Sequence, residues 1–237
     1  MMRPGLAANL LAALLVSAVP ALGQSPVPPD EAEFRDLYRE LVEIDTTLSA
    51  GSCTEAAEAM ARRLRAAGLP EEGIRILAPA DRPKSGALIA TLPGSDRELL
   101  PIVLLAHIDV VEARREDWGR NPFELVEEGG FFYARGASDD KAMAAAFTDA
   151  LIRYRREGFV PRRDLKLALT CGEETPATFN SVKWLLATQP EVLRAKFVLN
   201  EGAGGLLDAL GKPQLLQVQA GEKIYQDFQL ETSDRGG

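Results

Sequence analysis

The chain has 237 residues, of which 46% are hydrophobic and 26% charged, an ordinary composition for a globular protein with one substantial core. Its 27 Lys and Arg residues stand against 35 Asp and Glu residues, which gives a formal net charge of −8. An acidic chain without a basic cluster is poorly suited to a phosphate backbone, so we expect no nucleic acid partner.

The first residues predict an export signal. Arg3 provides a short positive region, residues 6–19 form an uncharged stretch rich in Leu and Ala, and Ala21-Leu22-Gly23 offers a cleavage site before Gln24. The apolar stretch is shorter than the ~20 residues of a membrane-spanning helix, and Pro20 interrupts it, so we expect no stable membrane span. The mature protein is therefore expected to be secreted or periplasmic.

Apolar spacing and turn residues predict helices that alternate with short strands. In chain order, we expect a helix over 30–44, a helix over 54–67 capped by Thr54, strands over 74–77, 87–92 and 102–106, and a hairpin over 123–133. These are followed by a helix over 141–156, a strand over 165–170, a helix over 181–187, and strands over 197–199, 215–218 and 225–230. The strands 102–106 and 197–199 are continuous apolar runs and are expected to be buried. This alternation indicates an α/β fold in which helices sandwich a mixed, largely parallel sheet.

The two cysteines, Cys53 and Cys171, lie far apart in the sequence. An oxidising compartment would allow them to pair, but separation along the chain says nothing about proximity in space. We expect two buried small residues, with a disulfide as the alternative.

Charged side chains follow three of the predicted strands directly. The strand over 102–106 leads into His107 and Asp109, the strand over 165–170 into Glu173 and Glu174, the strand over 197–199 into Glu201, and Asp139-Asp140 opens a helix. Open α/β sheets bind ligands beyond the carboxyl ends of their strands. We therefore expect these side chains to converge.

Taken singly, each of these residues has an ordinary structural explanation: a histidine satisfied in the core, an Asp at a helix N-cap, a Glu pair in a solvated loop. Taken together, a cluster of like charge is costly unless a cation neutralises it. His107 and Asp109 lie two residues apart on extended chain and point to one face, which suits a carboxylate that orients an imidazole toward a metal. One histidine with several carboxylates suits zinc or a similar ion.

Five segments resemble, in this order, motifs of the zinc exopeptidase and amidohydrolase family: LLAHIDVV (104–111), WGRNPF (118–123), YARGASDDK (133–141), GEE (172–174) and NEGAGG (200–205). That family includes carboxypeptidase G, carboxypeptidase S, the aminoacylases and succinyl-diaminopimelate desuccinylase. The likeness covers residue 34 to the end of the chain. It implies a zinc-exopeptidase-like catalytic domain and a zinc-dependent hydrolase that cleaves an amide bond of a small peptide or an N-acyl amino acid.

The resemblance also implies a set of metal ligands. His107 and Glu201 would bind one zinc ion, Asp139 would bridge two ions, and Glu174 would bind the second. Asp140 falls at a position that the family does not use as a ligand.

Two further residues receive catalytic roles from the resemblance. Glu173 would be the general base that takes a proton from the attacking water, and Asp109 would support the imidazole of His107. Gly172 departs from the pattern, because relatives often carry Asp just before the Glu pair.

The largest departure concerns histidine, since His107 is the only one in the sequence. The family places the last ligand of the second zinc, a histidine, far downstream and contributes another histidine from a smaller lid domain. We therefore expect an amino-terminal fragment, inactive by itself, whose full-length form could dimerise through the missing lid. Its expected parts are a signal peptide (1–23), a flexible lead-in (24–33), an incomplete catalytic domain (34–221) and the first strand of a truncated α+β lid (222–237). The alternative is a non-catalytic extracytoplasmic α/β protein, degenerate from the family, that binds a metal or another ligand.

Overall fold

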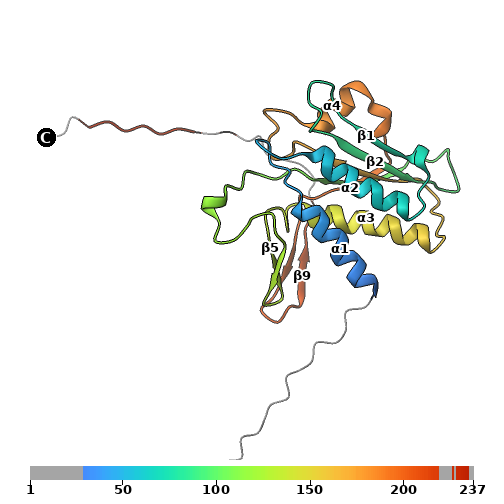
Figure 1. The fold of residues 1–237 in the computed structure, drawn as a ribbon, viewed down its shortest axis with the longest axis horizontal. Helices are drawn as coiled ribbons and strands as arrows, with labels where there is room; N and C mark the ends of the chain where they lie inside the picture. The colour runs from blue at the N-terminus through green and yellow to red at the C-terminus, as the bar shows by residue number, and fades with distance from the viewer. Residues whose placement is uncertain (1–28, 219–225, 227, 235–237) are drawn as a thin grey trace, which may run out of the picture.

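The structure is a computed structural model and describes residues 29–218, 226 and 228–234. Its helices are α1 (Pro29–Glu43), α2 (Cys53–Ala66), α3 (Lys141–Arg156) and α4 (Ser181–Thr188), with short 3₁₀ helices η1 (Glu71–Gly73), η2 (Arg115–Asp117) and η3 (Pro190–Val192) (Figure 1). Its strands are β1 (Ile74–Leu77), β2 (Ala87–Leu92), β3 (Ile102–His107), β4 (Val126–Glu128), β5 (Phe131–Tyr133), β6 (Leu165–Thr170), β7 (Phe197–Leu199), β8 (Gly205–Leu207) and β9 (Pro213–Leu216).

A five-stranded mixed sheet in the order β1-β2-β6-β3-β7 forms the centre of the fold, which confirms the predicted α/β class. β3 runs parallel to both β6 and β7, whereas β2 pairs antiparallel with β1 and with β6. Parallel pairing is thus confined to β6, β3 and β7, the three strands that lead into predicted site residues. Among these strands, His107 at the end of β3 lies opposite Thr170 at the end of β6, so the two strands end level.

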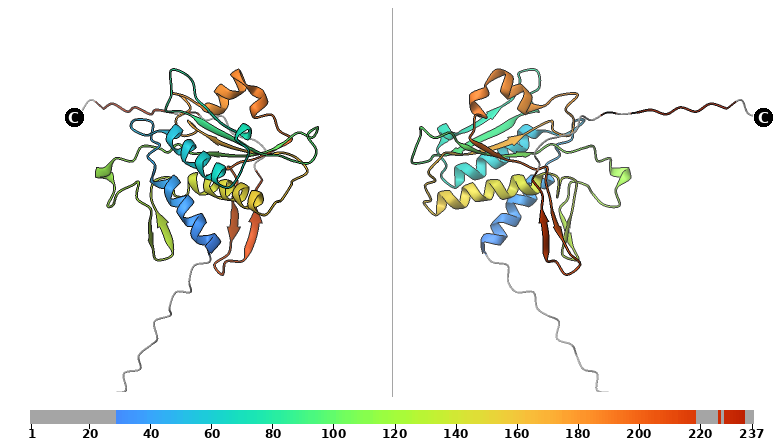
Figure 2. Two further views of the ribbon diagram at one scale, coloured as in Figure 1. Left: turned by 45° about the vertical axis from the view of Figure 1, so that its right-hand side comes forward. Right: turned by 180° about the vertical axis from the view of Figure 1, so that it is seen from behind.

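Helices cover both faces of the sheet (Figures 1 and 2). α1, α2 and α3 pack on one face around a core that includes the fully buried Leu41 and Met60. α4 and η3 pack on the other face, where Leu185 is fully buried. Successive residues of β2 serve the two layers, because Leu88 belongs to the first core and Ile89 to the second.

The expectation that residues 197–199 form a buried strand is wrong. β7 is at the edge of the described sheet, and Phe197, Val198 and Leu199 are each more than half exposed. A continuous apolar run cannot distinguish a central strand from an edge strand, because that depends on which segment lies beside it.

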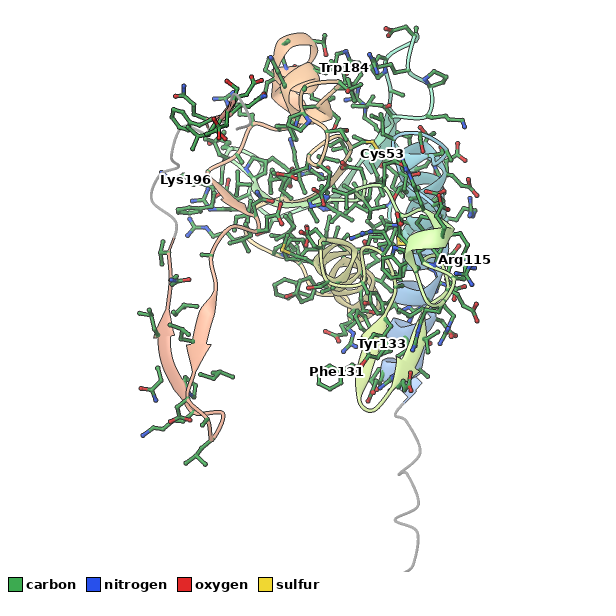
Figure 3. The ribbon with its side chains drawn as sticks, turned by 90° about the vertical axis from the view of Figure 1, so that its left-hand side faces the viewer. Cys53, Arg115, Phe131, Tyr133, Trp184 and Lys196 are labelled. Atoms are coloured by element: carbon green, nitrogen blue, oxygen red, sulfur yellow. A yellow bond between two sulfur atoms is a disulfide. The ribbon has the colours of Figure 1, made fainter. Side chains whose placement is uncertain are left out.

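Two hairpins extend beyond the sheet, β4–β5 and β8–β9 (Figure 3). The first confirms the hairpin predicted over 123–133, and β9 replaces the strand predicted over 215–218. Part of the strand predicted over 225–230 lies outside the described residues. Its described members, Gln226 and Phe228–Leu230, are not in a strand. The predicted signal peptide and residues 24–28 of the lead-in also lie outside the described residues. Residues 29–33 belong to α1, so the expectation of a flexible lead-in is wrong there.

A disulfide joins Cys53, the first residue of α2, to Cys171, which follows β6, and their Cα atoms are 6.0 Å apart. The expectation of two unpaired cysteines is therefore wrong. Because α2 packs on the sheet, its amino terminus lies beside the end of a strand that is 118 residues away in sequence. The prediction of Thr54 as the N-cap of α2 is also wrong. The side chain of Ser52 accepts the capping hydrogen bond, from the N–H of Glu55.

Among the described residues, every helix is too short or too polar to cross a membrane.

Candidate metal centre

The ends of the parallel strands bring the predicted residues to one edge of the sheet. β3 ends in His107 itself, Glu173 and Glu174 follow β6, and Glu201 follows β7. Asp139 reaches the same place from the loop that precedes α3. This is the edge at which open α/β sheets bind ligands.

His107, Asp139 and Glu201 form the tightest group in this region. The Nε2 atom of His107 lies 2.9 Å from Oδ1 of Asp139 and 3.6 Å from Oε1 of Glu201. One ligand atom from each of the three residues lies within 4.8 Å of the other two. The imidazole is buried, but 68% of the Asp139 side chain is exposed, so the group opens to solvent on the carboxylate side.

The other ring nitrogen of His107 is held by Asp109. The Nδ1 atom lies 3.0 Å from the backbone carbonyl oxygen of Asp109 and 3.7 Å from its carboxylate. A carbonyl oxygen can only accept, so Nδ1 carries the proton in this hydrogen bond. Nε2 is therefore the ring nitrogen that faces Asp139 and Glu201, and it could bind a metal ion once its own proton is released.

The carboxylate of Asp109 makes different contacts. It accepts hydrogen bonds from the backbone N–H groups of Glu173, at 3.2 Å, and Glu174, at 3.0 Å. The sequence placed Asp109 beside His107, and the structure adds that its carboxylate also holds the start of the loop after β6. Its side chain is almost fully buried, which strengthens these hydrogen bonds.

The pKa values at this edge show mutual repulsion among the acids. Burial, reinforced by the charge of Asp139, raises the pKa of both Glu174 and Glu201. Burial lowers the pKa of His107, but the charges of Asp109 and Glu201 outweigh it, and the net shift is upward. A divalent cation would relieve this repulsion.

Asp140 is, with Asp109, one of the two buried acids of the group. Its side chain is 5% exposed, and its Oδ2 atom has no hydrogen-bond partner among the described residues. Burial, with a contribution from Glu201 and against the attraction of His107, raises the pKa of Asp140 to about 7. It occupies the N-cap position of α3 but makes no side-chain capping hydrogen bond.

An open cavity of about 670 Å³ lies over this edge and is lined by His107, Asp139, Glu173 and Glu201. Glu174 is in neither the lining of this cavity nor the three-ligand group, although it lies close enough to Asp139 for their charges to interact. An imidazole nitrogen and several carboxylate oxygens in one cavity suit zinc as a donor set, so the residues present fit such an ion.

Cys53, Cys171 and Asp109 form a second compact group of metal-ligating residue types. The two sulfur atoms are bonded to each other in the disulfide, so neither is a thiolate ligand.

Lys141 was not among the predicted site residues. Its side chain is fully buried at the start of α3, and Nζ donates a hydrogen bond to the backbone oxygen of Ile44 at 2.7 Å. Burial, opposed by the charges of Asp45 and Asp109, lowers the pKa of Lys141 to about 7. The sequence signal for a buried lysine was the apolar run AMAAAF that directly follows Lys141. A lysine that faces solvent does not require apolar neighbours.

The fold and this edge define an α/β protein with a candidate cation site made of a histidine and carboxylates. The chain belongs to peptidase family M20/M25/M40, whose family model matches residues 103–224. Among known relatives, it is 36% identical to the N-fatty-acyl-amino acid synthase/hydrolase PM20D1 of Xenopus tropicalis over 126 residues, which is 52% of this chain and 25% of that protein. It is 28% identical to aminoacylase-1 of Pongo abelii over 183 residues, 77% of this chain and 44% of that protein.

Solved structures show the same fold. The M20 family metallo-carboxypeptidase Sso-CP2 of Sulfolobus solfataricus superposes with a TM-score of 0.61 at 22% identity, over 77% of this chain and 39% of that one. Human carnosine dipeptidase 1 gives a TM-score of 0.58 at 20% identity, over 72% of this chain and 38% of that one. The chain thus spans between a quarter and less than half of the length of these relatives.

Proposed function

We propose that the full-length protein hydrolyses an amide bond of an N-acyl amino acid or a small peptide with the help of zinc ions at this edge of the sheet. The observation that carries the proposal is the convergence of His107, Asp139 and Glu201 in an open cavity that Glu173 also lines. The family, and relatives named as an aminoacylase and an N-fatty-acyl-amino acid hydrolase, support this class of substrate.

In this proposal, His107 and Glu201 hold one ion, Glu174 holds a second, and Asp139 contacts both. Zinc ions bound there would supply the positive charge that polarises the amide carbonyl and activates water. The exposed Asp139 carboxylate and Nε2 of His107 already face each other, as such a role requires.

Glu173 acts as the general base, accepting a proton from the attacking water and passing it to the leaving amine. Its carboxylate lines the cavity, whereas its backbone N–H is held by the carboxylate of Asp109. Asp109 therefore positions the base and the imidazole together, and does not itself take part in proton transfer.

Substitution of Glu173 and Asp139 tests the proposal in the full-length protein. Glu173→Gln should lower the hydrolysis of N-acyl amino acids or dipeptides by about 10²–10⁴-fold while zinc content stays near that of the wild type, because a general base is not a ligand. Asp139→Ala should lose zinc as well as activity. Glu98→Gln, at an exposed loop position, is the matched control.

Equal zinc loss in the Glu173 and Asp139 variants would contradict the roles assigned here. A wild-type protein that binds zinc but cleaves none of these substrates would favour the alternative, a non-catalytic binding protein.

We also propose that the protein is exported. The signal-like amino terminus and the disulfide between Cys53 and Cys171 support this proposal, since disulfides persist in oxidising compartments. Amino-terminal sequencing of protein from the periplasm or medium should find Gln24 first, and an intact Met1 in cytoplasmic protein would contradict export. The homodimer through a lid domain stays a prediction.

A further inference from the structure

A groove lined by aromatic rings lies between α1 and the β4–β5 hairpin. It encloses about 500 Å³, a volume typical of small-molecule sites. Small side chains of the segment 134–142 form part of its lining, and its rings are those of Phe34, Tyr38, Trp118, Phe132 and Tyr133.

The two rings of the groove that come from the hairpin are exposed to solvent, whereas Tyr38 is buried. Phe132 is 37% exposed and Tyr133 is 42% exposed, and Figure 3 shows Tyr133 on the short hairpin that projects beyond the sheet. Tyr38 meets Phe132 edge to face, with ring centroids 5.4 Å apart, and stacks on Phe34 at 6.0 Å. Phe132 thus packs against the buried Tyr38, and the hairpin rings present an apolar surface to solvent. Exposed apolar surface of this kind is typical of binding sites.

The groove shares a loop with the candidate metal centre. The hydroxyl of Tyr38 donates a hydrogen bond to the backbone oxygen of Ala137 at 2.5 Å. Ala137 and Ser138 line the groove, and the next residue, Asp139, contacts Nε2 of His107. Consecutive Cα atoms lie about 3.8 Å apart, so the groove begins within one residue of the proposed bridging ligand.

Arginine side chains stand over three rings of the groove. The guanidinium of Arg35 lies 5.4 Å from the centroid of Phe132 and is paired with Glu31 and Glu127. The guanidinium of Arg120 lies 5.0 Å from the centroid of Tyr133, and that of Arg135 lies 5.1 Å from the centroid of Trp118. Arg120 is also paired with Glu128. Arg135 forms no ion pair within the described part of the chain, and its buried Nε atom lacks a hydrogen-bond partner there. An apolar groove with such a cation beside it is complementary to an amphiphile that carries a carboxylate.

We propose that this aromatic groove binds the acyl chain of an N-acyl amino acid substrate, with Arg135 available to the polar end of the molecule. The inference rests on the proposed function, because it places the scissile amide at Asp139 and the apolar chain along the neighbouring rings. The proposal predicts that substrates with long acyl chains are preferred. Each methylene buried in the groove should raise affinity about three- to fourfold.

Tryptophan fluorescence tests binding separately from hydrolysis. N-dodecanoylglycine, held below its micelle concentration and in the presence of a chelator, should shift the emission of Trp118 to shorter wavelength in a saturable manner. The shift should vanish in Trp118→Phe and persist in Trp184→Phe, since Trp184 lies in α4 on the opposite face of the sheet. N-acetylglycine should give no shift. Absence of a saturable shift, or its persistence in Trp118→Phe, would overturn the proposal.

A hydrolysis assay then links the groove to substrate choice. Phe132→Ala in the zinc-loaded full-length protein should lower kcat/KM for N-dodecanoylglycine at least tenfold and leave that for N-acetylglycine unchanged. Phe159→Ala is the matched control, because Phe159 is also about half exposed but packs on Tyr154 outside the groove.

The two assays distinguish the groove proposal from the proposed hydrolytic function. Equal losses for both substrates in Phe132→Ala would overturn the groove proposal while hydrolysis itself stands. Saturable binding at Trp118 without turnover of either substrate would overturn the proposed function but uphold the groove as an acyl-chain site.

Discussion

The carboxylate of Asp109 accepts a hydrogen bond from the backbone N–H of Glu174 at 3.0 Å, across a separation of 65 residues in sequence. The same carboxylate holds Glu173, and the carbonyl of Asp109 holds the imidazole of His107. One buried residue at the end of β3 therefore fixes both the histidine and the acidic loop after β6.

Removing this carboxylate should release the backbone N–H groups of Glu173 and Glu174, whereas the Asp109 carbonyl that holds His107 is kept. Asp109→Ala is expected to weaken zinc binding by about 10–100-fold, the usual effect of losing a group that orients metal ligands. Competition with a chromophoric chelator measures the change. Asp208→Ala is the control, because Asp208 accepts backbone hydrogen bonds in the turn between β8 and β9, away from the cavity. Unchanged zinc affinity in Asp109→Ala would show that these hydrogen bonds do not position the ligands.

Glycine is required at position 172 by both the backbone conformation and the neighbouring atoms. Its φ is +89°, and a Cβ there would overlap the carbonyl oxygen of Phe179. Gly172→Ala should destabilise the protein by about 2–5 kcal/mol, from left-handed strain together with overpacking. Gly158→Ala, at φ +70° in open space, should cost only about 1–2 kcal/mol. Urea denaturation of both variants compares the two, and equal losses would contradict the role given to Phe179.

The disulfide should contribute strongly to stability, because it closes a loop between residues 118 apart in sequence. Replacing both Cys53 and Cys171 with Ala should lower the free energy of unfolding by about 2–4 kcal/mol. Dithiothreitol should lower the melting temperature of the wild type to a similar extent and leave the double variant unaffected. A wild type whose melting temperature does not respond to reduction would count against the bond.

Asp140 should make the metal-free protein sensitive to pH. Its pKa rises from 3.8 to about 7 on folding, so the folded state holds a proton that the unfolded state has released. The stability tied to this proton is fully present below the unfolded pKa and is lost as the pH rises through about 7. Relative to the wild type, Asp140→Asn should therefore be more stable at pH 8 than at pH 5. Thermal melts in a chelator measure this difference, and a difference independent of pH would refute it.

Local signals in the sequence were sufficient where an element is self-contained. α3 (Lys141–Arg156) and β6 (Leu165–Thr170) begin and end at the predicted residues, since Pro161 separates their two apolar patterns. The exposure of β7 and the Cys53–Cys171 bond could not be predicted, because each depends on segments that meet only in the folded chain. The convergence of His107 and Glu201 followed from strand polarity, whereas Asp139 comes from the loop before α3. The hydrogen bonds of the Asp109 carboxylate required the loop geometry after β6.

The bond between Cys53 and Cys171 also has a chemical consequence. Reduction would leave two thiol groups beside the Asp109 carboxylate, all within 4.8 Å of one another. Thiolates are soft ligands with high affinity for zinc and copper(I). Protein prepared under reducing conditions would therefore carry a competing metal-binding group beside the Asp109 carboxylate, which holds the start of the loop after β6. Formation of the disulfide thus removes two thiolate ligands from the neighbourhood of the candidate metal centre.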